Sequence, residues 1–209
     1  MIDFVPFPLL FGIAILVALL AIHRKRKYSP WYPFFFSVFW VYLLLIIEVT
    51  IFPIPMPQAW TGIATKQQAA FILSHVNLVP FSYLGFFNRY VIFQEVGRNI
   101  LLTIPFGFGI SFIARVRPKD LLWLSLGAGL AIEGTQLAVS LGLGGLYRTV
   151  DVTDVLVNAI GVWLGYGCFM FFSHLYLSRT RQLGIEPRGV LAYVHEVAAR
   201  AQPGGAKSG

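Results

Sequence analysis

Apolar residues dominate five stretches of this chain, which polar residues separate, at about 4–22, 31–52, 98–114, 121–140 and 153–176. A bilayer core about 30 Å thick needs roughly 20 helical residues to cross it, and each stretch comes near that length. The pattern predicts five transmembrane helices. We therefore expect an all-α fold, a polytopic membrane helix bundle.

Polar and small residues recur at helical spacing in the fourth and fifth stretches. Positions three and four apart share one helix face. The fourth stretch has Ser125, Gly129, Glu133, Gln136 and Ser140 at this spacing, and the fifth has Asp151, Asp154, Asn158, Gly161, Gly165 and Cys168. Since small residues let membrane helices approach closely, and Gly161 and Gly165 form a GxxxG pair, these faces are expected to pack inside the bundle.

The polar groups of several stretches converge at one depth. A rise of 1.5 Å per residue places Glu133 about 10 Å below the end of its helix and Asn158 about 7 Å below the start of the next. Glu48, near the end of the second stretch, approaches the same level. An ionisable group in a membrane segment costs a few kcal/mol or more and normally faces the bundle interior. The sequence thus predicts one site formed by Arg98, Asn99, Glu133, Gln136, Arg148, Asp151, Asp154 and Asn158.

Lys and Arg are distributed unequally between the two sides of the predicted bundle. Four fall on one side, namely Lys66, Arg89, Arg98 and Arg148, and ten on the other, namely Arg24, Lys25, Arg26, Lys27, Arg115, Arg117, Lys119, Arg179, Arg181 and Arg188. The positive-inside rule then places the N-terminus outside and the C-terminus in the cytoplasm. The first basic block follows its apolar stretch, so we expect a retained first helix rather than a signal peptide.

Composition supports a membrane protein and argues against several other classes. Only 12% of the residues are charged, against about 25% in typical soluble domains. The net charge of +7 comes from blocks that flank apolar stretches, which disfavours nucleic acid as a partner. The single cysteine, Cys168, excludes an intramolecular disulfide. Because the histidines are scattered and no phosphate-loop, dinucleotide or serine-hydrolase motif occurs, we expect no metal and no cofactor.

Two segments lie outside the apolar stretches. The 53–97 loop is expected outside the cell, with a short amphipathic helix in "QQAAFILSHV" and many aromatic residues suited to the headgroup layer. We divide the chain into a transmembrane domain, 1–182, which includes this loop, and a basic cytoplasmic tail, 183–209. The tail is expected to form one short helix and to end in disorder.

Each polar group has a structural and a functional interpretation. Glu133 with Gln136 either fixes helix packing or binds a ligand. Asp151 and Asp154 suit helix capping, yet capping does not require both of them together with Arg148. In a binding site, Arg98 and Arg148 would hold a phosphate, and the carboxylates would hold an amine or a hard divalent cation.

The motifs resemble the VanZ-like family. The resemblance rests on "NLVPF" (77–81), "GRNILLTIPFG" (97–107), Glu133 followed by Gln136, and "YRTVDVTDVLVNAIGVWLGY" (147–166), and it covers about residues 75–170. It implies a small multi-pass protein of the bacterial cytoplasmic membrane whose namesake is associated with resistance to teicoplanin, a glycopeptide antibiotic. It brings no list of catalytic residues.

Two functions remain open on the sequence, besides a third and weaker alternative, a purely structural partner of another membrane protein. One is a protein that binds an envelope lipid or lipid-linked cell-wall precursor in an outward-facing polar pocket and reduces sensitivity to glycopeptides. The other is a membrane-embedded enzyme that uses Glu133 with Asp151 or Asp154 on a lipid-linked substrate. We favour binding, because the sequence contains no unambiguous nucleophile.

We predict that a tag at the N-terminus is accessible to a membrane-impermeant label on intact cells and that a C-terminal tag is not. The excess of Lys and Arg on the C-terminal side is the physical reason. The same label applied to opened cells is the control. A cytoplasmic N-terminus would overturn the predicted orientation.

Overall fold

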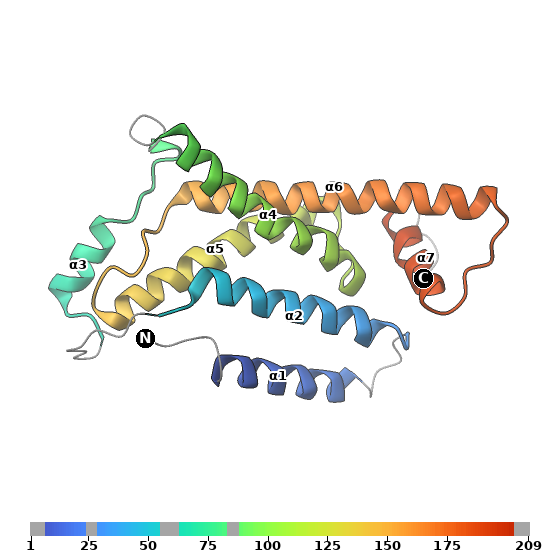
Figure 1. The fold of residues 1–209 in the computed structure, drawn as a ribbon, viewed down its shortest axis with the longest axis horizontal. Helices are drawn as coiled ribbons and strands as arrows, with labels where there is room; N and C mark the ends of the chain where they lie inside the picture. The colour runs from blue at the N-terminus through green and yellow to red at the C-terminus, as the bar shows by residue number, and fades with distance from the viewer. Residues whose placement is uncertain (1–6, 24–28, 55–62, 83–87, 203–209) are drawn as a thin grey trace.

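The computed structural model describes residues 7–23, 29–54, 63–82 and 88–202, which form a bundle of helices (Figure 1). The helices are α1 (Phe7–His23), α2 (Tyr32–Ile51), α3 (Lys66–Ser74), α4 (Arg89–Ile113), α5 (Pro118–Leu143), α6 (Val152–Gln182) and α7 (Val190–Ala201). Helices α2, α4, α5 and α6 are long and apolar enough to cross a membrane, and α1 has a shorter apolar run, Pro8–Ile22. The predicted all-α membrane bundle is confirmed.

Helix α4 starts earlier than predicted. Asn88 accepts a hydrogen bond from the backbone N–H of Tyr90 at 2.9 Å and so caps a helix that begins at Arg89 rather than at 98. Arg98 therefore lies within a helix instead of opening one. Helix α6 likewise continues to Gln182, beyond the predicted end at 176.

The short helices expected in the loop and the tail are present. Helix α3 starts with a capping box, in which Thr65 and Gln68 bond each other's backbone N–H groups. Helix α7 occupies the predicted tail. The basic block 24–27, parts of the 53–97 loop and the last residues, 203–209, lie outside the described residues.

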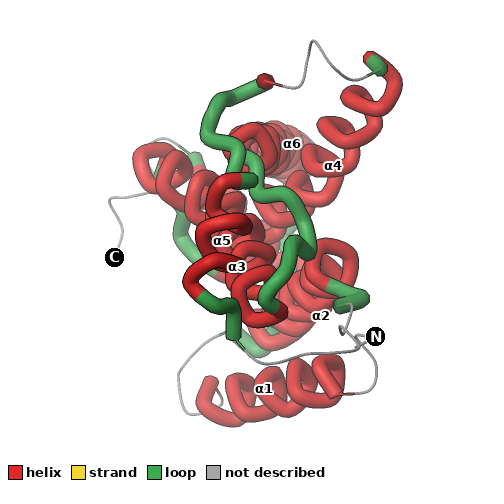
Figure 2. Tube along the Cα trace, turned by 90° about the vertical axis from the view of Figure 1, so that its left-hand side faces the viewer, coloured by secondary structure: helices red, strands yellow, loops and turns green. Residues whose placement is uncertain are grey.

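Helix α6 packs against α4, α5 and α7 (Figures 1 and 2). Its contact with α4 is a backbone contact: a Cβ atom on Gly161 would lie 2.0 Å from Thr103 Oγ1, and one on Gly165 would lie 2.0 Å from the Ile104 carbonyl oxygen. Gly107 makes the reciprocal approach to α6. The GxxxG pair predicted from sequence thus sets the distance between α4 and α6. Cys168, predicted on the same inward face, is instead exposed.

Helix α5 meets a different side of α6. A Cβ atom on Gly129 would lie 2.8 Å from the Val155 carbonyl oxygen, and Trp163 donates its indole N–H to Ser125 Oγ at 3.1 Å. The outer faces of both helices are apolar, with Trp123 75% and Phe171 67% exposed, as lipid contact requires. Helix α1 packs on α2, where Trp40 donates its indole N–H to the Gly12 carbonyl oxygen.

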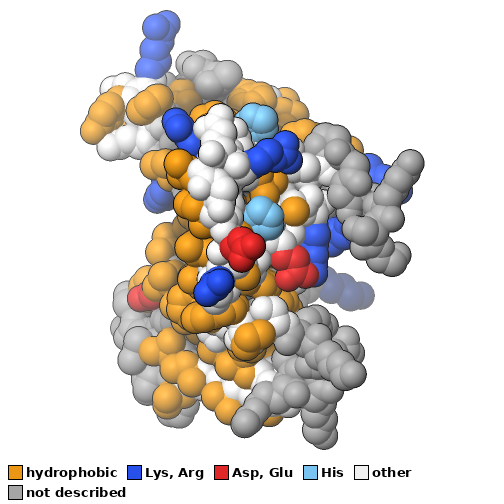
Figure 3. Space-filling model, turned by 90° about the vertical axis from the view of Figure 1, so that its right-hand side faces the viewer, with side chains coloured by type: hydrophobic (Ala, Val, Ile, Leu, Met, Phe, Trp, Pro, Cys, Tyr) orange, Lys and Arg blue, Asp and Glu red, His pale blue; other side chains and the backbone are white. Residues whose placement is uncertain are grey.

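The two ends of the bundle differ in character. We call the end that holds the first residues of α4 and α6 the polar end. The opposite end, the basic end, carries Arg115, Arg117, Lys119, Arg179, Arg181 and Arg188, and Figure 3 shows its Lys and Arg side chains. The unequal distribution of Lys and Arg predicted from sequence is therefore a difference between the polar end and the basic end of the bundle. Which end faces the cytoplasm stays a prediction.

Helix α7 folds back onto the basic end. Tyr193 and Val197 form a buried cluster with Phe112 and Phe169, and the Tyr193 hydroxyl donates to the Phe112 carbonyl oxygen. Burial raises the pKa of Tyr193 to about 12, so this hydroxyl keeps its proton at physiological pH. The tail is therefore packed against the transmembrane helices as far as Ala201.

We predict that Gly165→Ala lowers the melting temperature of the purified protein. The new methyl group would overlap the Ile104 carbonyl of α4, and overpacking of this kind costs roughly 1–3 kcal/mol or more. Thermal unfolding in detergent measures the effect. Gly167→Ala is the matched control, because a Cβ atom there meets nothing within 4 Å. Equal melting temperatures for the two variants would contradict the packing.

Candidate functional site

Asp151 joins three elements at the polar end. It is the N-cap of α6 and accepts the backbone N–H of Thr153 at 2.6 Å through Oδ1, while Oδ2 accepts Asn77 Nδ2 at 2.7 Å. Its own backbone N–H donates to Glu133 Oε2 of α5 at 3.1 Å. Both carboxylate oxygens thus accept a hydrogen bond, which confirms the capping role.

The segment 77–82 lies across the first residues of α6. Asn77 and Asp151 form a parallel β-bridge, in which the Asn77 N–H donates to the Val150 carbonyl and the Val152 N–H donates to the Asn77 carbonyl, both at 2.9 Å. The Phe81 N–H donates to Thr153 Oγ1 at 2.9 Å. This segment therefore has a fixed position over the start of α6.

Helix α4 is bonded to α6 just below the cap. Asn99 donates from Nδ2 to Asp154 Oδ1 at 2.9 Å, and Thr103 donates to the Asn158 carbonyl oxygen at 2.9 Å. The close approach of the two backbones at Gly161 brings these short side chains within reach. Asp154 and Asn158, four residues apart, consequently share the face of α6 that borders α4 and α5.

Gln136 and Glu133 are buried on α5, with exposed fractions of 7% and 4%. Gln136 donates from Nε2 to the Thr50 carbonyl oxygen of α2 at 3.2 Å, so its amide holds two helices together. Glu133 faces α6 instead. Glu133 and Gln136, expected to act together, thus contact different neighbours: Gln136 bonds α2, and Glu133 bonds the N-cap of α6.

A cavity of about 700 Å³ opens among these elements. Its lining includes all eight residues predicted as a site: Arg98, Asn99, Glu133, Gln136, Arg148, Asp151, Asp154 and Asn158. Glu133 and Asn158, which were predicted to lie at a similar depth, both border this space. The structure brings the predicted group together, whereas its binding of a ligand stays a prediction.

Further polar residues of the lining escaped the sequence argument. Asn77 and Ser82 come from the loop, and Glu95 comes from the part of α4 that was assigned to the loop. Glu95 lies three residues before Arg98, so helical spacing would have found it had the helix start been known. Glu48 is exposed and absent from the lining, which Thr50 joins instead, because positions two apart lie on opposite helix sides.

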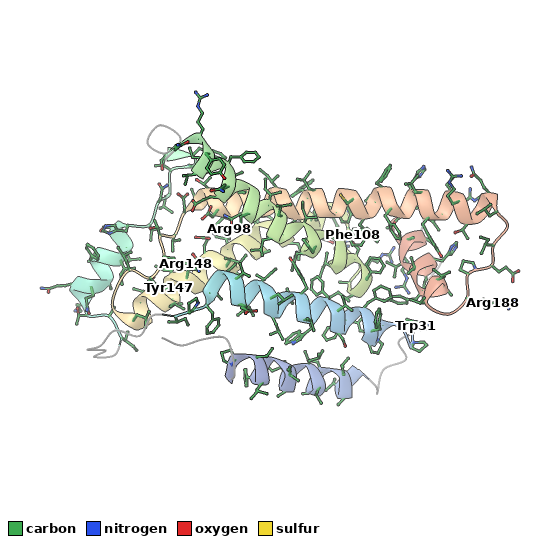
Figure 4. All side chains as sticks on the ribbon, in the orientation of Figure 1. Trp31, Arg98, Phe108, Tyr147, Arg148 and Arg188 are labelled. Carbon is green, nitrogen blue, oxygen red and sulfur yellow. The ribbon has the colours of Figure 1, made fainter. Side chains whose placement is uncertain are left out.

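Arg98 and Arg148 lie at the same end of the bundle, whereas Arg188 lies at the other (Figure 4). Within the described residues, neither Arg98 nor Arg148 comes within 4.0 Å of a carboxylate oxygen. Arg148 packs over the Tyr147 ring, 5.4 Å from its centroid, and the Tyr147 hydroxyl donates to the Ile51 carbonyl of α2. Two guanidinium groups that form no salt bridge with any described residue thus border the cavity.

Acceptors are also left free. Asn158 is 2% exposed, and its Oδ1 has no hydrogen-bond partner in the described part of the chain. Across the same ranges, Glu133 accepts a hydrogen bond only through Oε2 and Asp154 only through Oδ1, so that Glu133 Oε1 and Asp154 Oδ2 are free. No group of three His, Cys, Asp or Glu among these residues is arranged to hold a metal ion.

The chain matches one known protein family. A sequence profile of the family described as VanZ/LLP1 aligns with residues 39–173, which is more than half of the chain. The chain belongs to the VanZ/LLP1 family. No curated protein and no solved structure matches it.

The VanZ/LLP1 region extends from Phe39 in α2 to Ser173 in α6 and contains the whole lining of the cavity. It excludes α1, the last turns of α6 and α7. The VanZ-like resemblance seen in the motifs is thereby confirmed over a longer part of the chain than the motifs cover. A multi-pass membrane protein of this family is the identity that follows.

We predict that Asp151→Ala lowers the free energy of unfolding by roughly 1–2 kcal/mol, since it removes the cap of α6 and the bond to Asn77. Thermal unfolding in detergent is the measurement. Asp120→Ala is the control, because that carboxylate also lies in the first turn of a helix but pairs only with exposed Arg117. If both variants melt like the wild type, the junction at Asp151 contributes no stability.

Proposed function

We propose that this VanZ/LLP1 protein resides in the bacterial cytoplasmic membrane and binds, in its polar cavity, the headgroup of an envelope lipid or a lipid-linked cell-wall precursor. Binding there reduces the sensitivity of the cell to glycopeptide antibiotics, which act on cell-wall precursors at the outer face of the cytoplasmic membrane. The polar end is then the outer end, in agreement with the distribution of Lys and Arg.

The observation that carries this proposal is the pair of arginines without salt bridges. Arg98 and Arg148 come from different elements, line one cavity, and keep their guanidinium donors free of carboxylates within the described residues. Planar guanidinium groups bind phosphate through paired hydrogen bonds. A phosphate is the group common to membrane lipids and lipid-linked precursors, so it suits both.

The cavity also has an apolar wall. Val49, Leu102 and Ile132 belong to three different helices and border the same space as the charged groups. A ligand with a charged head and an apolar chain would satisfy both parts of the lining. The volume of about 700 Å³ lies within the usual range of small-molecule sites, roughly 300–1,000 Å³.

The catalytic alternative requires carboxylates that are free to exchange protons with a substrate. Asp151 uses one oxygen in the cap and the other in the bond from Asn77 Nδ2, which leaves Glu133 with Asp154 as the pair for catalysis. Catalysis by this pair gives no role to Arg98 and Arg148, which have no salt bridge within the described residues, so we favour binding.

We predict that expression of the wild-type protein raises the glycopeptide concentration needed to inhibit a sensitive host, and that Arg148→Ala and Glu133→Gln reduce this protection. Loss of one charged hydrogen bond, about 1.5–3 kcal/mol, corresponds to roughly 10- to 100-fold weaker binding. Growth inhibition at matched membrane levels is the measurement.

Arg188→Ala serves as the control, because Arg188 is an exposed arginine at the basic end. It should protect as well as the wild type. A host that gains no protection from the wild type would contradict the resistance role. Full protection by Arg148→Ala and Glu133→Gln would contradict the site.

A further inference from the structure

The cavity contains more unused acceptors than a phosphate alone would explain. Buried polar atoms in folded proteins nearly always have partners, so an orphan in a cavity indicates a missing one. Asn158 Oδ1 is such an atom: its residue is 2% exposed, borders the cavity and has no donor within the described residues. The amide carbonyl can only accept, hence the missing partner is a hydrogen-bond donor.

Two carboxylates border the same cavity as this carbonyl. Asp154 is one turn before Asn158 on the same face of α6. Glu133 reaches the start of α6 from α5, where it accepts the Asp151 N–H at 3.1 Å. Each has one oxygen that is free in the described part of the chain. Three acceptor groups, two of them acidic, therefore surround the start of α6.

The arrangement of signs is not random. Glu95 lies on α4 close to Arg98, but the buried acceptors belong to α6 and α5, whereas Arg98 is exposed on α4 and half-buried Arg148 precedes α6. A ligand that satisfies both groups carries its anion at the arginines and a cationic donor at the buried acceptors. A primary ammonium group has three N–H donors, which matches the three acceptor groups.

On the basis of the proposed function, we infer that the cavity selects a zwitterionic aminophosphate headgroup of the ethanolamine type. Its phosphate lies between Arg98 and Arg148, and its protonated amine lies among Glu133, Asp154 and Asn158. A quaternary ammonium has no N–H to donate and fits less well. A phosphate without an amine leaves the acceptors unsatisfied.

The test is lipid competition on the purified full-length protein, followed by native mass spectrometry, with the same acyl chains in all three phospholipids. The probes are phosphatidylethanolamine, phosphatidylcholine, phosphatidylglycerol and a polyprenyl diphosphate. We expect phosphatidylethanolamine to bind roughly tenfold more tightly than phosphatidylcholine or phosphatidylglycerol, which is the effect of one charged hydrogen bond on a dissociation constant. Phosphatidylethanolamine should also bind more tightly than the polyprenyl diphosphate, which represents the lipid-linked precursor.

Variants separate the amine site from the phosphate site. Asp154→Asn keeps an oxygen for the Asn99 bond but removes the charge, so the preference for phosphatidylethanolamine over phosphatidylglycerol should disappear. Asn158→Leu should have the same effect. Arg148→Ala should weaken the binding of both lipids and leave the ratio of their affinities unchanged. The ratio of the two lipids is measured within one spectrum, so loss of folded protein does not alter it. If Asn158→Leu does not fold, the result for Asp154→Asn alone tests the amine site.

The outcomes distinguish the inference from the proposed function. Equal binding of phosphatidylethanolamine and phosphatidylglycerol, both sensitive to Arg148→Ala, would overturn the amine site and leave the lipid site intact. Tighter binding of the polyprenyl diphosphate would also overturn it and identify the precursor as the ligand. If no lipid binds saturably, or binding ignores Arg148→Ala, the proposed function itself fails.

Discussion

Backbone contact between α4 and α6 is the constraint on which the polar end depends. Glycines at 107, 161 and 165 leave no room for a side chain between the two helices. At this separation short groups such as those of Asn99 and Thr103 span the gap to α6. Longer polar side chains are then free to point into the cavity. The position of the charged groups is thus set by residues that carry no charge.

Placing polar groups in a membrane bundle requires that each find a partner, and this protein meets the requirement unevenly. Asp151 and Gln136 are bonded to neighbouring elements and connect them. Arg98, Arg148 and Asn158 keep donors or acceptors free within the described residues. The first group stabilises the helix contacts around the cavity, and the second leaves donors and acceptors in the cavity without partners among the described residues. That division is typical of a binding site built on a rigid frame.

The sequence predicted much of this arrangement because hydropathy and helical spacing are strong signals in membrane proteins. Membrane-length stretches indicated the long helices, and spacings of three and four placed Glu133, Asp154 and Asn158 on inward faces. The start of α4 was missed because Arg89, Gln94 and Glu95 interrupt the apolar residues between 88 and 97, and the Asn88 cap is seen only in the structure. Asn77 was quoted in a motif, but its bridge to Asp151 spans distant parts of the chain, which no local pattern reveals.

Helix α6 is 31 residues long, which at 1.5 Å per residue is about 46 Å, well beyond a bilayer core of about 30 Å. It begins at the cavity and ends next to α7, which is packed against its far part (Figure 1). The same rigid rod therefore forms a wall of the cavity and supports the helix at the opposite end. Any tilt of α6 that widens the cavity must displace α7 as well. One continuous helix therefore connects the cavity to α7, and its glycine contact with α4 lies between them.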